Sequence, residues 1–461
     1  MYRLEEKNLN YRLKRGSNRR MQQTQEVQTS GHTDSSTVTL STELRNKIKY
    51  KSSETELLQP PSQKLLQCEQ KANVHISNQE YKEALPELMR YIALARICYG
   101  DNHWKMAEAH VNLAQGYLQL QGFSLQAKQH AEKAKEILLA SSLIPSSESE
   151  QRMDILQCSF AISHTLGRAL TAIHKLKDAE RSLIKARKLS EELLQGQHMP
   201  PDKWMEIKAE IELSFAQLYQ SQKKSKEALL CYQKALNYTE KSKGEDNLEC
   251  VPIYKKIAGA AQILRDHDTA IQHLVKAHFI ALRKSPSSVE AGNTAHLVAR
   301  AAVASKKSDH NDLAEKYFQE SINSFKEAEG MGSAKCLAAE DDFSQFLIDT
   351  GQQERAALML KGSLEAKKAT FGDLSPEVAE TYWLLGVTEL AQGHTNLAHK
   401  KLKKCLYLQT LLYGSHNKRT LATKETIDLL SKTPDVATEQ RGTDEEKPPL
   451  PCSTTLRGGR N

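Results

Sequence analysis

The sequence predicts an all-α protein built as a right-handed helical-repeat solenoid, with about eight stacked helix pairs and a C-terminal capping helix. Three observations support this fold class. Between residues 61 and 432, apolar residues recur at positions i, i+3, i+4 and i+7, the pattern of amphipathic helices. Strand-like alternation is scarce in the same stretch. A small residue also returns there at a nearly constant interval, which indicates a repeat.

The repeat register comes from an alanine near the start of the second helix of each predicted pair. Successive alanines are 43, 52, 49, 42, 44, 42 and 42 residues apart. A fixed period of this size is typical of helical solenoids, and the two longer intervals predict longer loops. The eight positions are Ala84, Ala127, Ala179, Ala228, Ala270, Ala314, Ala356 and Ala398.

Two polar tails flank the predicted solenoid. Residues 1–60 are rich in Ser, Thr and Gln, with 11 Lys or Arg against 7 Asp or Glu, and residues 433–461 are similar in character. Such segments bury too little apolar surface to offset the entropy of ordering, so we expect both to be disordered. The basic stretch "YRLKRGSNRR" and the "KPPLP" motif at 447–451 are interpreted as solvated tail. The first could instead be a nuclear signal, a lipid-binding patch or a nucleic-acid arm, and the second could dock on an SH3 or WW domain.

Composition narrows the function classes. The net charge is +7 over 461 residues, which gives no strong case for binding nucleic acid or a membrane surface. No apolar run approaches the roughly 18 residues of a membrane-spanning helix, and the N-terminus lacks the apolar core of a secretory signal. The eight cysteines never form C-x-x-C and indicate reduced thiols. We therefore expect a soluble cytoplasmic protein without direct membrane insertion.

The stretch "YGDNHWKMAEAHVNLAQGYLQL" at 99–120 looks at first like a binding site, because His103 and Trp104 follow a glycine. Similar stretches begin at Phe371 and Tyr413, one repeat apart. A glycine ends a helix well in a left-handed conformation, and Asp, Asn or Ser can cap the next helix. The pattern therefore predicts a junction between helix pairs rather than a metal site.

No catalytic motif is found. The sequence contains no H-E-x-x-H, G-x-G-x-x-G, G-x-x-x-x-G-K-[ST] or G-x-S-x-G. We therefore predict no enzyme activity, no cofactor and no metal site.

The repeat units resemble tetratricopeptide repeats. The third unit carries Leu166, Gly167, Ala179, Leu183 and Ala186 at the offsets of that pattern, and the eighth carries Leu385, Gly386, Ala398 and Leu402. The resemblance implies that the first helix of each pair lines a concave groove that binds a peptide or helix. The predicted groove residues are Glu108, Gln115, Gln119, His164, Arg168, Gln217, Gln220, Lys255, Gln262, Glu380 and Trp383. The Lys and Asn clamp of chaperone-binding relatives is incomplete, since Gly259 follows Lys255 where Asn is needed.

Longer segments are similar to one particular family. The stretches "ICYGDNHWKMAEAHVNLAQGYLQLQGFSLQAKQHAEKAKEIL" and "FGDLSPEVAETYWLLG" with "KKLKKCLYLQTLLYG" look like the tetratricopeptide repeat protein 23 family, over roughly residues 60–432. The resemblance implies a non-enzymatic scaffold of the primary cilium, located near the ciliary base in the Ellis–van Creveld zone. It also implies an IQ-motif protein as partner and a role in Hedgehog signalling.

An alternative is a cargo adaptor for a microtubule motor, similar to kinesin light chains, which is suggested by the 42-residue period. Kinesin light chains carry coiled-coil heptads before their repeats, and residues 1–60 contain no sustained heptad. A third alternative is that the protein is an enzyme. An enzyme would need a pocket with clustered acid or base groups, and no such cluster is found in the sequence.

Overall fold

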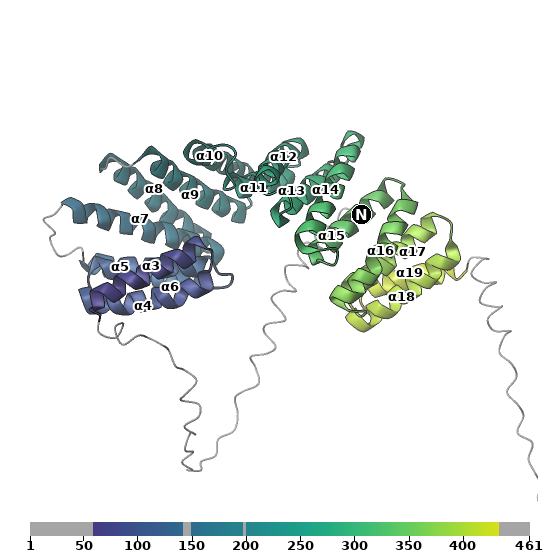
Figure 1. The fold of residues 1–461 in the computed structure, drawn as a ribbon, viewed down its shortest axis with the longest axis horizontal. Coiled ribbons are helices and arrows are strands. Elements are labelled where there is room, and N and C mark those ends of the chain that lie inside the picture. Colours follow the sequence, from purple (N-terminus) through teal and green to yellow (C-terminus); the bar gives the residue numbers. More distant parts are fainter. Residues whose placement is uncertain (1–58, 142–148, 197–199, 433–461) are drawn as a thin grey trace, which may run out of the picture. The chain divides into compact units, whose positions relative to one another are not determined.

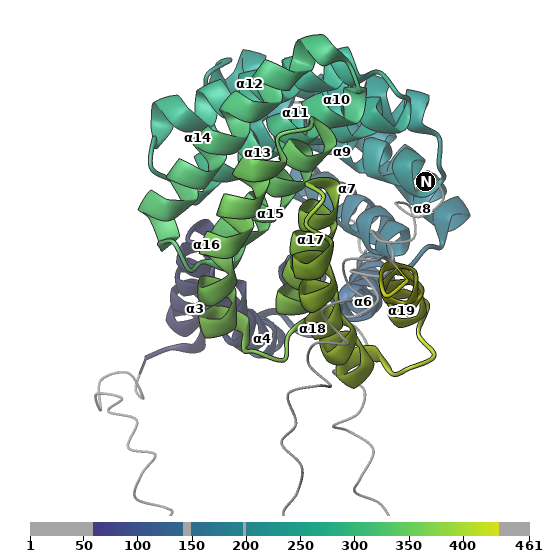
Figure 2. The ribbon, with the colours of Figure 1, turned by 90° about the vertical axis from the view of Figure 1, so that its right-hand side faces the viewer.

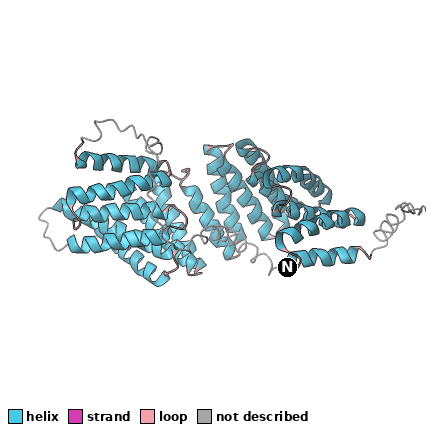
Figure 3. Ribbon diagram, turned by 90° about the horizontal axis from the view of Figure 1, so that it is seen from below, coloured by secondary structure: helices cyan, strands magenta, loops and turns pink. Residues whose placement is uncertain are grey.

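The computed structural model describes residues 59–141, 149–196 and 200–432. The predicted tails, apart from residues 59 and 60, lie outside these ranges, as does the "KPPLP" motif. The described part of the chain consists of 17 α-helices and one short 3-10 helix, without a strand (Figure 3). The predicted fold class is confirmed.

The helices form eight consecutive pairs and a last single helix (Figure 1). The first four pairs are α3 (Pro61–Ser77) with α4 (Tyr81–Tyr99), α5 (Trp104–Leu118) with α6 (Ser124–Ser141), α7 (Ser149–Ala172) with α8 (Leu176–Gly196), and α9 (Pro201–Ser221) with α10 (Ser225–Lys243). The next four are α11 (Cys250–Ile263) with α12 (His267–Lys284), α13 (Val289–Ser305) with α14 (Asn311–Glu329), α15 (Ala334–Asp349) with α16 (Gln353–Phe371), and α17 (Pro376–Ala391) with α18 (Thr395–Tyr413). The single helix is α19 (Lys418–Leu430), and the 3-10 helix η1 (Ser308–His310) precedes α14.

The predicted alanine register is reproduced in every pair. Each of the eight alanines is the fourth residue of its even-numbered helix, and none is more than 1% exposed. A side chain that ends at Cβ lets the odd-numbered partner helix approach closely, since interaxial distance depends on the side chains at the contact. Each helix packs mainly against its neighbours in sequence, and Figure 2 shows α12 and α14 on the outer side of α11 and α13.

Two glycines mark the closest helix contacts. A Cβ placed on Gly167 in α7 would lie 2.6 Å from Cδ2 of Leu183 in α8. A Cβ on Gly386 in α17 would lie 2.6 Å from Cγ of Leu402 in α18. Only glycine leaves room at these two positions, which explains why the same offset carries glycine in the third and eighth pairs.

The turns within pairs and the junctions between pairs use different backbone conformations. Each turn within a pair has one residue with φ between 56° and 88°, and the residue need not be glycine: Gln79, Gly122, His174, Lys223, Arg265, Lys306, Gly351 and Gly393. Five junctions between pairs instead have glycine at φ 83–91° with ψ 154–171°: Gly100, Gly244, Gly330, Gly372 and Gly414. That second region is accessible essentially to glycine alone.

The stretch at 99–120 is such a junction. Gly100 has the predicted positive φ, but its ψ of 171° is extended rather than left-handed helical. The cap of α5 is His103, whose Nδ1 accepts a hydrogen bond from the Lys105 backbone N at 3.1 Å. Ser375 and Asn417 cap α17 and α19 at the equivalent positions. His103 therefore serves as a helix cap, a role that the sequence suggested for Asp, Asn or Ser.

The predicted capping helix also takes its expected place. Ile427 and Leu430 of α19 are buried with Ala398 and Leu402 of α18. They cover apolar surface that the next pair would cover if the stack continued.

Candidate functional site

The predicted groove residues differ strongly in how far they reach solvent. Gln119, Gln217, Gln220 and Glu380 are exposed, whereas Glu108, Gln115, Arg168, Lys255, Gln262 and Trp383 are half-buried and His164 is buried. Only some of the predicted groove positions therefore carry exposed side chains, and the binding of a partner at these residues stays a prediction.

Several of these residues form ion pairs or hydrogen bonds with other side chains of the chain. Lys255 Nζ lies 2.9 Å from Glu290 Oε1, and Glu108 Oε2 lies 2.9 Å from Lys105 Nζ. Glu380 Oε2 is 3.4 Å from Arg419 Nη1 of α19, and Gln220 Oε1 accepts a hydrogen bond from Tyr232 Oη at 2.8 Å. Trp383 packs against two clusters of the apolar core and is largely structural.

Two predicted residues, Gln115 and Gln119, line a pocket, which we call the α3–α5 pocket. Its volume is about 270 Å3. Besides these two glutamines, it is lined by Glu69, Ala72, Asn73, Ile76, Tyr81, Leu88, Tyr91, Asn112 and Gly116. Amides, a carboxylate and two phenols around a partly apolar floor suit the polar backbone and one or two side chains of a peptide.

Burial and nearby carboxylates raise the pKa of one phenol of this pocket further above its usual value. Burial raises the pKa of the Tyr91 hydroxyl, and the nearby Glu108 and Glu69 carboxylates raise it further. Tyr91 therefore remains protonated near neutral pH and can donate a hydrogen bond.

His164 and Arg168 of α7 lie together, but not as an open site. His164 Nε2 lies 2.8 Å from Ser214 Oγ of α9, and its ring stacks on Phe160 at 5.6 Å between centroids. Burial, with a smaller contribution from the positive Arg168, lowers the pKa of His164 to about 3. A neutral, enclosed imidazole of this kind joins α7 to α9 and does not act as a general base near neutral pH.

The same pair of residues, with different partners, recurs three repeats later, where the sequence predicts no groove residue. His296 Nε2 lies 3.0 Å from Asp342 Oδ2 of α15, and Arg300 Nε lies 3.6 Å from the same oxygen. His164 and Arg168 are each 132 residues before His296 and Arg300. That matched spacing is the signal by which the second cluster could have been found.

A buried cation between α15, α16 and α17 was also missed. Lys367 is fully buried, is ion-paired with Asp341, and donates to Thr381 Oγ1 at 2.7 Å. Burial raises the pKa of Asp341, and Lys367 opposes that rise. Lys367 lies on α16, the second helix of its pair, where the repeat pattern specifies only apolar and small residues.

Other kinds of site receive no support from the described residues. No group of three or more His, Cys, Asp or Glu in residues 59–141, 149–196 and 200–432 could hold a metal ion. The seven cysteines in these ranges are free thiols. Over the same ranges, every helix is too short or too polar to cross a bilayer.

Comparison with known proteins decides the family. No family model matches the chain. Tetratricopeptide repeat protein 23 of Homo sapiens is 54% identical over 427 residues, which cover 93% of the chain and 95% of the human protein. The Bos taurus protein of the same name is 55% identical over 421 residues, covering 91% and 94%. The chain belongs to the tetratricopeptide repeat protein 23 family.

Further relatives of the family are more distant. A tetratricopeptide repeat protein 23-like protein of Mus musculus is 33% identical over 375 residues, covering 81% of each chain. Among solved structures, the apo form of RapI covers 74% of the chain and 86% of RapI, with a TM-score of 0.51 and 13% identity, a likeness of fold. A putative kinesin light chain from Podosopora anserina has a TM-score of 0.40 over 47% of the chain and 99% of its own, too low to support the motor-adaptor alternative.

Family membership assigns a broad function. Tetratricopeptide repeats are protein-interaction modules, so the tetratricopeptide repeat protein 23 family falls among the protein-interaction scaffolds. This agrees with the polar α3–α5 pocket and with the scaffold predicted from the sequence.

Proposed function

We propose that the chain is a non-enzymatic scaffold that holds a peptide or helix of a partner protein in the α3–α5 pocket. The observation that carries this proposal is the pocket itself, where Gln115 and Gln119 meet Glu69 and Asn73 of the preceding pair. Side-chain amides can donate to and accept from a peptide backbone, and the apolar floor can hold an anchoring side chain.

We further propose where the scaffold acts and with which partner. Membership of the tetratricopeptide repeat protein 23 family supports a place at the primary cilium, near its base in the Ellis–van Creveld zone. The same membership supports an IQ-motif protein as partner and a contribution to Hedgehog signalling. The protein would then reside in the cytoplasm and at the ciliary base.

A binding experiment with the full-length chain tests the pocket. Gln115→Ala combined with Gln119→Ala should weaken capture of the IQ-motif partner about tenfold or more, since several hydrogen bonds are lost from one site. The matched control is Gln217→Ala combined with Gln262→Ala, which changes two amides of the predicted groove outside the pocket. Loss of binding only in the control pair would contradict the assignment to the pocket.

Localisation is tested separately. A tagged chain should be found at the base of the cilium in ciliated cells, and proximity labelling from it should mark the IQ-motif protein. A chain that stays away from the cilium would remove the ciliary part of the proposal and leave the binding result unaffected.

A further inference from the structure

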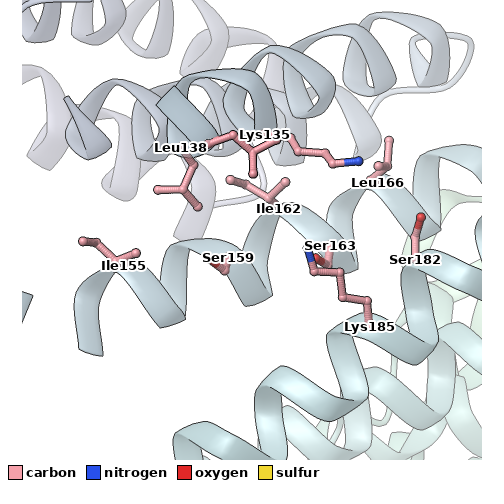
Figure 4. A pocket seen from close by; sticks show the side chains of 10 residues that line it. Lys135, Leu138, Ile155, Ser159, Ile162, Ser163, Leu166, Ser182 and Lys185 are labelled. Atoms are coloured by element: carbon pink, nitrogen blue, oxygen red, sulfur yellow. The ribbon is translucent and has the colours of Figure 1, made fainter. Parts of the chain in front are cut away.

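A second pocket lies outside the predicted groove, between α6, α7 and α8 (Figure 4). Its volume is about 170 Å3. It is lined by Lys135, Leu138, Leu139, Ile155, Ser159, Ile162, Ser163, Leu166, Ser182 and Lys185. We call this the α6–α8 pocket.

The α6–α8 pocket faces away from the groove residues of the same helix. At 3.6 residues per turn, Ile155, Ile162 and Leu166 fall on one side of α7. His164 and Arg168 fall on roughly the opposite side. A ligand in the α6–α8 pocket would therefore contact the side of α7 that faces away from His164 and Arg168.

The pocket combines an apolar floor with a basic rim. Leu138, Ile162 and Leu166 are each no more than 9% exposed and form the floor. Lys135 of α6 and Lys185 of α8 are exposed and stand on the rim. Figure 4 shows the Lys135 side chain extended from α6 toward Leu166.

The charges of these lysines are not balanced inside the described part of the chain. In α6, Lys128 pairs with Glu132 and Lys133 pairs with Glu136. No ion pair joins Lys135 or Lys185 to a carboxylate among the described residues. Two cations on separate helices therefore flank an apolar recess, and an anion placed between them would be attracted by both.

We propose that the α6–α8 pocket binds an acidic segment of a protein partner, with one apolar side chain in the recess and carboxylates on Lys135 and Lys185. The volume suits this, because an apolar cavity of about 150 Å3 accommodates a benzene ring. A recess between three helices holds a single side chain, whereas a lipid surface is met by a broad apolar helix face. The proposal is independent of the ciliary assignment and of the α3–α5 pocket.

The test uses the purified full-length chain and a fluorescein-labelled synthetic peptide, EEFLEE, with EEGGEE as the peptide control. EEFLEE should bind, and Lys135→Glu with Lys185→Glu should weaken it roughly tenfold or more. Lys177→Glu with Lys188→Glu is the matched control: it makes the same charge change on exposed lysines of α8 outside the pocket, and should alter binding by less than about twofold.

A third variant tests the recess rather than the charge. Ser159→Phe places a ring in the pocket and should also weaken binding of EEFLEE roughly tenfold, while circular dichroism reports the fold. Three outcomes would overturn the proposal: no binding of EEFLEE, equal binding of EEGGEE, or equal losses in the two lysine pairs. Binding of phosphatidylserine vesicles with the same dependence on Lys135 and Lys185, in place of peptide binding, would assign the pocket to a membrane and overturn it too.

Discussion

The third and sixth helix pairs carry the same side chains at the same repeat positions, yet they use them differently. His164 of α7 is buried and faces the neutral Ser214, whereas His296 of α13 is half-buried and faces the carboxylate of Asp342. The difference comes from the following pair in each case, not from the histidine itself. A repeat position therefore determines which neighbour a residue meets, and the neighbour determines its chemistry.

The largest expected effect concerns the small residue three positions after each histidine, Gly167 or Ala299. Gly167→Ala should destabilise the protein by about 1–3 kcal/mol, because the new Cβ would clash with Leu183. Ala299→Gly should also destabilise, by about 1 kcal/mol, because it removes a buried methyl group and lowers helix propensity. Thermal unfolding followed by circular dichroism measures both changes.

Gly362 provides the control for that pair of substitutions. It lies inside α16, has an ordinary φ, and a Cβ there would meet nothing within 4 Å. Gly362→Ala should therefore raise the unfolding temperature, by the equivalent of about 0.5–1 kcal/mol. If Gly167→Ala stabilised the protein equally, α7 and α8 would not pack as closely at Gly167 as the structure shows.

The next effect is a pH dependence. Burial lowers the pKa of His164 to about 3, whereas histidine in an unfolded chain titrates near 6.5. Between these values the unfolded chain binds a proton that the folded chain excludes, so stability falls as the pH falls below about 6.5. The loss from His164 should be about 2 kcal/mol at pH 5.

His164→Gln should remove this part of the pH dependence, measured as urea unfolding midpoints between pH 7 and pH 5. His164→Gln leaves the other histidines in place, so the slope that remains reports their contribution. An unchanged slope in His164→Gln would show that this imidazole is not shielded from solvent.

Substituting the hydrogen-bond partner should destabilise the protein more at His164 than at His296. Ser214→Ala leaves a buried imidazole nitrogen without its partner and should cost about 1–2 kcal/mol. Asp342→Asn should cost less than about 1 kcal/mol, because Asp342 is 44% exposed and its ion pairs are screened by solvent. Unfolding midpoints of the two variants, measured side by side, give the two stability losses. A larger loss for Asp342→Asn than for Ser214→Ala would show that Ser214 is open to water.

The smallest effect concerns the turns within the two pairs. His174 and Lys306 have φ of 60° and 56°, where three other pairs have glycine. Replacing either residue by glycine should stabilise the folded protein by about 0.5–1 kcal/mol, because glycine adopts the left-handed conformation at a lower free-energy cost than His or Lys. Unfolding temperatures of His174→Gly and Lys306→Gly check this, and Gly122→Ala in the second pair should move the temperature the other way.

The repeat register could be predicted from the sequence, but the burial of each predicted site residue could not. Ala84 and its seven equivalents are predictable because every pair needs a small residue at the same helix contact. His164 was assigned to the groove by its repeat offset, which indicates a helix face and not how closely the next pair covers it. That depends on Ser214, 50 residues away, and on the packing of α9, which no local pattern describes.

The α3–α5 pocket illustrates the same limit. The sequence predicts Gln115 and Gln119 but not Glu69, Asn73 or Tyr91. Tyr91 lies on α4, the second helix of its pair, whereas groove residues are predicted only on first helices. His103 was recognised as part of a junction, yet its role as the cap of α5 depends on a rotamer that the sequence does not reveal.

The short reach of the contacts has a consequence for biosynthesis. The bonds from His164 to Ser214 and from His296 to Asp342 join residues only 50 and 46 positions apart. Contacts so local form quickly, and a growing chain folds its N-terminal part first. Each new pair would then cover the apolar face left by the one before it while the ribosome is still translating. Only one such face is then open to solvent at any time, and α19, the last helix of the described residues, covers the final one.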